Sequence, residues 1–223
     1  MSGLVRGDGW VTLNYPVEAM RFTLLYDGPL PSTAHVEVED TYRLRKAFHE
    51  QLAEVWDKKP MLSEELKQWR KLSLEQRRGI PPEHKDYFIK PSDYGPFQFV
   101  PLVTKFHLLT CELDILFLRA EKPGSIFKVN SAGDLDNRLG VLFDALQLPK
   151  QLNQLPVDAS PEPRHKPFLC LLENDDLITA VRIESERLYE PSDSAIANHV
   201  RLTIRATVKA QQYTWKTLDI TAD

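Results

Sequence analysis

The sequence predicts an α+β fold, with one small mixed sheet packed against two core helices in a single domain. Three observations support this. Strand and helix patterns follow one another in the order strand, helix, strand, helix, strand, strand. The 223 residues, 42% of them hydrophobic, suffice for one sizeable core with room for insertions. No internal repeat or low-complexity tract interrupts the chain, so we expect one domain over residues 1–223.

The first predicted elements are a strand and a long helix. Residues 21–26, RFTLLY, are typical of a strand, and turn-forming residues follow at 27–32. From Asp40 to about Asp57, apolar residues recur at spacings of three and four, which predicts an amphipathic helix. Asp40 is a candidate N-cap, and Pro60 is expected to stop the helix soon after its end. Residues 1–18 support no assignment.

Two segments are interpreted as insertions. Residues 58–100 are charged and rich in prolines and aromatics, with short helices expected at 63–71 and 73–78. After Gly79 the prolines are too frequent for a regular element. Residues 147–167 form a second proline-rich loop. The predicted core therefore covers about 19–57, 101–146 and 168–210.

The second half of the chain contains the strongest patterns. Residues 106–119 predict a strand, and a helix is expected from Asp134 to about Leu146, before Pro149. An apolar run and an acidic pair precede the next strand at 177–188. The last strand, 199–209, alternates apolar and polar residues, which predicts one buried and one exposed face.

The overall composition indicates the cellular compartment of the protein. No apolar run of about 18 residues occurs, and the N-terminus lacks the apolar core of a signal peptide. Cys111 and Cys170 each lie in an apolar run and are expected to be buried, reduced thiols. We therefore expect a cytoplasmic protein. The net charge of −4 argues mildly against nucleic-acid binding, although the distribution of charge matters more than its total.

The stretch GDLDNRLGVLFDALQLP, residues 133–149, places two acids at the start of the predicted helix. An apolar stripe, made of Leu135, Leu139, Leu142, Phe143 and Leu146, is flanked by Asp136, Gly140 and Asp144. Each acid alone has a structural explanation. Asp134 can cap the helix, Asp136 can favour its N-terminus, and Asp144 can be solvated.

A metal site is the second explanation of these acids. Asn137 directly follows the first pair, and a second pair, Asp175 and Asp176, precedes a later strand. Carboxylates from a helix start and a strand start can converge on one Mg²⁺, which prefers oxygen ligands. Without a cation, such carboxylates would repel one another.

These residues resemble the RusA family of Holliday junction resolvases. That family carries D-x-D-N at a helix start, an F-D-A-L run further along the helix and a D-D pair before the next strand. Here the three motifs are residues 134–137, 143–146 and 175–176. The strand at 21–26, the Pro-Leu-Pro-Ser turn at 29–32 and the strand around 108–118 also fit, so the resemblance covers roughly half the chain.

The resemblance implies a small α/β fold, a homodimer and Mg²⁺-dependent nicking of branched DNA such as Holliday junctions. Asp134, Asp136 and Asp176 match the metal-binding catalytic acids of the family. Asp175 matches a further acidic position beside the metal, and Asp144 matches another acid.

Three departures from the family open an alternative. Gly140 stands where the family has a lysine, the loop between residues 146 and 175 is longer, and residues 58–100 have no counterpart. A lysine at that position would contact a phosphate or the charge that develops in the transition state. The alternative is a catalytically degenerate RusA-like module that binds DNA or a protein partner without cutting. A hydrolase with a serine or cysteine nucleophile has no motif in this sequence.

Basic residues are candidates for contacts to the DNA backbone. One set, on one face of the last strand, is Arg201, Arg205 and Lys209. A second set, in the first insertion, is Lys67, Arg70, Lys71, Arg77 and Arg78, and Arg138 is a further candidate. The alternative, which the composition favours for both sets, is that they are ordinary solvated faces. Trp69 is expected to pack the insertion onto the core rather than to stack on a base.

Overall fold

A computed structural model describes residues 19–78, 88–120, 135–162, 166–189, 198–212, 217 and 219–220. The helices are α1 (Val38–Lys58), α2 (Pro60–Lys71), α3 (Leu74–Arg78) and α4 (Leu135–Leu146). The strands are β1 (Met20–Pro29), β2 (Ser92–Tyr94), β3 (Phe97–Val103), β4 (Leu109–Arg119), β5 (Phe168–Leu172), β6 (Ile178–Arg187) and β7 (His199–Ala210). Two 3-10 turns, η1 (Leu152–Gln154) and η3 (Asp175–Leu177), lie between them. The predicted α+β fold is confirmed.

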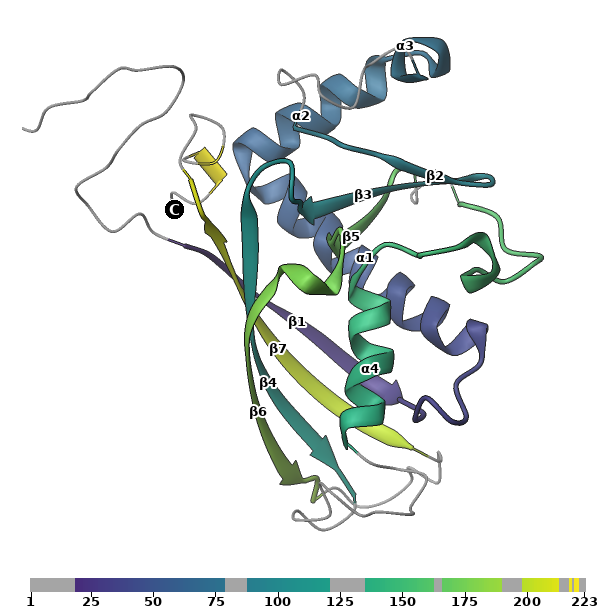
Figure 1. Cartoon of the computed structure of the whole chain (residues 1–223), viewed down its shortest axis with the longest axis vertical. Helices are drawn as coiled ribbons and strands as arrows, with labels where there is room; N and C mark the ends of the chain where they lie inside the picture. Colours follow the sequence, from purple (N-terminus) through teal and green to yellow (C-terminus); the bar gives the residue numbers. More distant parts are fainter. Residues whose placement is uncertain are drawn as a thin grey trace, which may run out of the picture.

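The larger sheet has four strands in the order β1-β7-β4-β6. β7 pairs antiparallel with both β1 and β4, whereas β6 pairs parallel with β4. α1 and α4 lie against one face of this sheet (Figure 1). The strands β1 and β6 are therefore the two edges, and β4 and β7 carry the centre.

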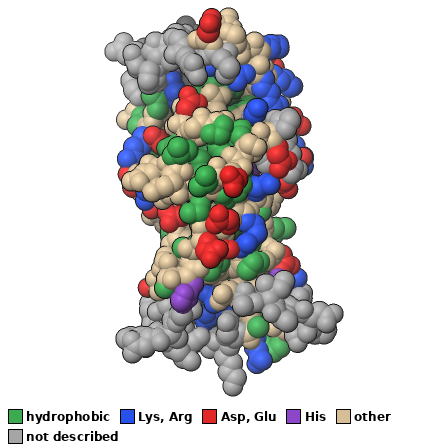
Figure 2. Space-filling view, turned by 90° about the vertical axis from the view of Figure 1, so that its right-hand side faces the viewer, with side chains coloured by type: hydrophobic (Ala, Val, Ile, Leu, Met, Phe, Trp, Pro, Cys, Tyr) green, Lys and Arg blue, Asp and Glu red, His purple; other side chains and the backbone are tan. Residues whose placement is uncertain are grey.

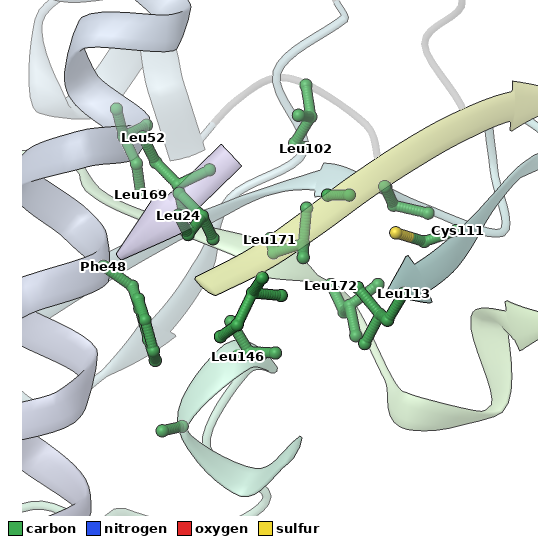
Figure 3. Packing of buried hydrophobic residues seen from close by; sticks show 14 of the residues in the cluster. Leu24, Phe48, Leu52, Leu102, Cys111, Leu113, Leu146, Leu169, Leu171 and Leu172 are labelled. Carbon is green, nitrogen blue, oxygen red and sulfur yellow. The ribbon is translucent and has the colours of Figure 1, made fainter. Parts of the chain in front are cut away.

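The alternation predicted for the last strand is confirmed. Every apolar residue from Val200 to Val208 is fully buried, and the polar residues between them are exposed or half-buried. Successive side chains of a strand point to opposite faces, so β7 gives one row to the core and one to the open face. The core is built from residues of α1, α2, α4, β1, β3, β4, β5 and β7, with Leu24, Phe48 and Leu146 among its members (Figure 3).

The start of α1 differs in detail from the prediction. Glu37, not Asp40, is the N-cap residue, and α1 begins at Val38. Asp40 occupies the third helical position, where its Oδ2 accepts a hydrogen bond from the Glu37 N–H at 3.1 Å. The two acids form a capping box, which satisfies amide groups that an isolated helix start leaves unbonded. Pro60 lies two residues beyond the end of α1, as predicted, and it also opens α2, a position where its missing N–H costs nothing.

The segment 58–100 contributes more to the fold than an insertion would. Its predicted helices are present as α2 and α3, and Trp69 is buried in the main core, as expected. The prolines do not prevent a regular element after Gly79, because β2 and β3 form an antiparallel pair. β3 also pairs in parallel with β5, giving a three-stranded sheet in the order β2-β3-β5.

A second apolar cluster underlies that smaller sheet. It contains Phe97, Phe99, Leu148, Leu155, Phe168 and Cys170. Cys111 lies in the main core, and both cysteines are free and buried, as the sequence predicted. Burial raises the pKa of the Cys111 thiol to about 12 and raises that of Cys170 as well. No helix in the described part of the chain is long and apolar enough to cross a membrane.

Candidate functional site

Asp134 lies outside the described residues, and the rest of its motif opens α4. Asp136 is exposed in the first turn, where its Oδ1 accepts a hydrogen bond from the Asn137 N–H at 2.8 Å. Asn137 Oδ1 accepts a hydrogen bond from Thr33 Oγ1 at 2.9 Å, which ties the helix start to the segment after β1. Asp136 therefore occupies the favourable N-terminal end of the helix dipole and faces water.

The apolar stripe of α4 is rotated relative to the prediction. Leu135, Leu142 and Leu146 are buried as expected, whereas Leu139 and Phe143 are only partly buried. Val141, Ala145 and Arg138 occupy the buried face in their place. Arg138, a candidate for contact with DNA, is only 2% exposed. One of its guanidinium nitrogens, Nη2, donates to Asn198 Oδ1 at 3.0 Å instead.

The other end of α4 holds a hydrogen-bonded network of two acids. Gln147, almost fully buried, donates from Nε2 to Asp144 Oδ1 at 2.9 Å and to Asp175 Oδ2 at 3.4 Å. The Asp175 N–H in turn donates to Gln147 Oε1 at 3.0 Å. Lys150 Nζ lies 3.8 Å from Asp175 Oδ2. The network fixes η3 against the C-terminal end of the helix.

Asp176 is bound to a lysine from another part of the chain. Lys105 Nζ lies 2.6 Å from Asp176 Oδ2, and the Lys105 N–H donates to Glu173 Oε2 at 2.7 Å. The hydrogen bond to Asp176 raises the pKa of Lys105 and so favours its charged form. A cation thus already compensates the carboxylate that the resemblance assigns to a metal.

The helix α4 separates the predicted metal ligands. Asp136 lies in its first turn, and Asp175 and Asp176 lie beside its last turn. Eight residues of helix rise by about 12 Å, whereas two oxygens bound to one Mg²⁺ lie only about 3–4 Å apart. Asp136 and Asp176 therefore do not share one ion in this structure. Among the described residues, which exclude Asp134, no three His, Cys, Asp or Glu side chains form a group that could hold a metal.

Gly140 lies on α4 at the position where the resemblance implies a lysine. Its Cα faces Thr33, and an added Cβ would lie 3.4 Å from Thr33 Cγ2. A Cβ at this position would therefore make an ordinary van der Waals contact. Lys105 and Lys150 lie at the opposite end of the helix, beside Asp175 and Asp176.

The basic residues of β7 are neutralised across the sheet. Arg201 lies 2.8 Å from Asp27 on β1, and Lys209 lies 2.6 Å from Glu112 on β4. Arg205 lies 3.6 Å from Asp114, its register partner on β4. Opposite charges directly across a sheet attract one another. A DNA phosphate would have to compete with these acids, so the face carries little net positive charge.

The basic residues of α2 have a different environment. Lys67, Arg70 and Lys71 are all exposed, and they fall within about 100° of one another around the helix axis. Within the described ranges none of the three forms an ion pair with an acid. Arg77 extends the surface, with its guanidinium stacked 5.4 Å from the Trp69 ring centre and donating to the Arg70 carbonyl. Lys67, Arg70, Lys71 and Arg77 are called the α2 basic surface below.

Sequence reasoning missed the residues that engage the second acidic pair. Gln147 and Lys105 come from separate parts of the chain, and no motif marks them. The Gln147 side chain could have been suspected, because a buried glutamine directly after an apolar helix needs partners. Nothing in the sequence indicated Lys105.

The chain matches no protein-family model, no curated protein and no solved structure in comparisons with known proteins.

Proposed function

We propose that this chain is a RusA-like module that binds branched DNA without cutting it, as a cytoplasmic homodimer. The observation that carries the proposal is the arrangement of charge. The α2 basic surface has no acidic partner within the described residues, whereas Asp136 and Asp176 are about a helix length apart and Asp176 is paired with Lys105.

The α2 basic surface supports DNA binding by its exposure and its local charge. Phosphate contacts from lysine and arginine release counterions, and this release provides most of the affinity of proteins for DNA. Lys and Arg side chains gather toward the upper end of the molecule in Figure 2, the end at which Figure 1 places α2 and α3. A local basic surface of this kind can bind phosphate even though the whole chain has a net charge of −4.

Several features argue for binding without cutting. Phosphodiester cleavage needs groups that stabilise charge on the scissile phosphate, and Gly140 supplies none where the resemblance expects an amine. Asp144 and Asp175 are engaged with Gln147, and Asp176 with Lys105. These contacts would have to break before the predicted magnesium ligands could come together.

The Mg²⁺-dependent endodeoxyribonuclease is the second candidate function. Two observations favour it: Asp136 is exposed at the start of α4, and Asn137 is held in place by a hydrogen bond from Thr33. In this candidate, magnesium chemistry would depend on Asp136 together with Asp134, and Asp176 would act only after its release from Lys105.

A labelled four-way junction distinguishes the two candidates. The protein is incubated with the junction and with linear duplex of equal length, in EDTA and in Mg²⁺. Tight junction binding with intact strands under both conditions supports the binding module. Mg²⁺-dependent nicks that vanish in Asp136→Asn, but persist in the exposed-loop control Asp158→Asn, establish the nuclease. No junction affinity at moderate salt overturns both and leaves a role in protein interaction.

A further inference from the structure

The strand β6 is an open edge of the larger sheet. It runs for ten residues, pairs only with β4 among the strands that the structure describes, and has seven exposed residues along its length. Val181, on the helix-facing side, is 42% exposed. A long edge strand presents a row of unpaired backbone N–H and C=O groups, which can pair with another strand.

The opposite edge of the same sheet is blocked at one residue. The Leu25 N–H on β1 donates to Gln51 Oε1 at 2.7 Å, and Gln51 Nε2 donates to the Leu25 carbonyl at 2.8 Å. Gln51 belongs to α1, so a helix side chain occupies the backbone groups that another strand would need. Within the described residues, no side chain bonds to the outer backbone of β6 in the same way. The two edge strands thus differ in whether a side chain bonds to their outer backbone groups.

The charges on β6 are arranged in a way that suits self-pairing. Arg182 and Glu184 point to the open face of the sheet, since their register partners on β4 are Asp114 and Leu116. They pair with each other within the strand. Ile183 lies between them on the helix-facing side, and Ser185 follows it.

Two-fold geometry restricts how β6 can pair with a second β6. Residues directly opposite in an antiparallel pair have their side chains on the same face of the sheet. A two-fold axis normal to the sheet must therefore pass midway between one residue and the same residue of the second copy. An axis at Ile183 places Arg182 opposite Glu184 twice and Ile183 opposite itself. An axis at Arg182 or Glu184 places two like charges opposite each other. Only the Ile183 register is charge-complementary near its centre.

We propose that β6 pairs antiparallel with β6 of a second copy of this chain, with the two-fold axis at Ile183. The pairing joins the two four-stranded sheets into one continuous sheet and satisfies the open edge. Arg182 and Glu184 of both copies form a ring of four alternating charges. This inference rests on the proposed function only for the expectation of a homodimer, and it names the surface. β6 shares no residue with the α2 basic surface.

The test is the mass of the full-length protein in sedimentation equilibrium, with reversed charges on β6. The wild type is expected to be a dimer. Arg182→Glu and Glu184→Arg each place like charges across the axis, so each variant alone is expected to be a monomer. Mixed in equal amounts, these two variants are expected to form a heterodimer, because every cross-strand pair is again opposite in sign. The double variant R182E/E184R is expected to be a dimer.

Mixing the two single variants distinguishes an ion pair between two copies from an ion pair within one strand. Loss of the Arg182–Glu184 pair inside one chain cannot be repaired by a second chain. Arg21→Glu, the same charge change on β1, is the control and is expected to leave the dimer intact. A monomeric wild type at the highest soluble concentration overturns the proposal, as does a dimer that all the variants retain. Junction affinity, measured separately, tests the proposed function whichever result is found.

Discussion

Lys105 Nζ lies 2.6 Å from Asp176 Oδ2, and this ion pair joins the turn before β4 to the 3-10 turn before β6. Asp176 is the residue that the resemblance assigns to a magnesium ion. Its carboxylate has a cationic partner already, and α4 separates it from Asp136. The ion pair is therefore the contact that any catalytic rearrangement would have to break.

Removal of the lysine should lower stability in a pH-dependent way. Because hydrogen bonding to Asp176 raises the pKa of Lys105 above its unfolded value, the pair stabilises the fold from neutral pH up to the ordinary lysine pKa, where the carboxylate is ionised and the amine is charged. This contribution is lost as the pH rises through the folded pKa. Lys105→Ala should therefore unfold at lower urea than the wild type at pH 7, with a gap that closes at strongly alkaline pH. A gap that is independent of pH contradicts this assignment.

Arg45 should be necessary for the attachment of the loop after α4. It is 2% exposed and donates to the Asp144 carbonyl at 2.8 Å and to the Gln154 carbonyl at 3.0 Å. Arg45→Met keeps much of the volume but leaves both carbonyls unbonded, which should cost about 2–3 kcal/mol of unfolding free energy. Lys46→Met removes an exposed ion pair with Glu162 and should cost less than about 1 kcal/mol. Urea unfolding compares the two, and equal costs would contradict the role of Arg45.

Gly140→Ala should stabilise the protein. Gly140 lies inside α4, where glycine is less favourable than alanine by about 0.5–1 kcal/mol, and the new Cβ meets Thr33 at an ordinary 3.4 Å. Gly95→Ala is the contrasting variant. Its φ of +57° is disfavoured for residues with a Cβ, so the same change should destabilise by about 1–2 kcal/mol. Thermal unfolding should shift in opposite directions for the two variants.

The two cysteines should be unreactive in the native state. Burial raises the pKa of the Cys111 thiol to about 12 and that of Cys170 further, so almost no thiolate exists at pH 8. A thiol reagent such as DTNB should modify neither cysteine in native protein and both after denaturation. Fast reaction of one native thiol would contradict the packing of its core.

The sequence predicted the elements with a strong local pattern and missed those created by distant pairing. The apolar–polar alternation of β7 and the helical spacing of α1 are local, and both elements are present. β3 was missed because Pro101 lies inside it and because its partner β5 is far along the chain. Parallel pairing of this kind leaves no periodic pattern in either strand.

The candidate site likewise has some features that follow from local sequence and others that depend on distant pairing. The position of Asp136 at the start of a helix followed from the local pattern. The ion pair of Lys105 with Asp176 and the cross-strand pairs of β7 depend on which residues the sheet places opposite each other. The distance between the two acidic pairs depends on the direction of α4 relative to β6. Spacing along the chain carries none of this information.

The most direct test compares junction binding by two charge-matched triple variants. In Lys67→Gln/Arg70→Gln/Lys71→Gln, loss of phosphate contacts should weaken junction affinity and reduce the slope of log affinity against log salt by about 2 to 3. Arg201→Gln/Arg205→Gln/Lys209→Gln removes the same charge from residues already paired with acids, and its affinity and slope should stay near the wild-type values. The proposed binding surface is contradicted if the second variant loses junction affinity while the first keeps it.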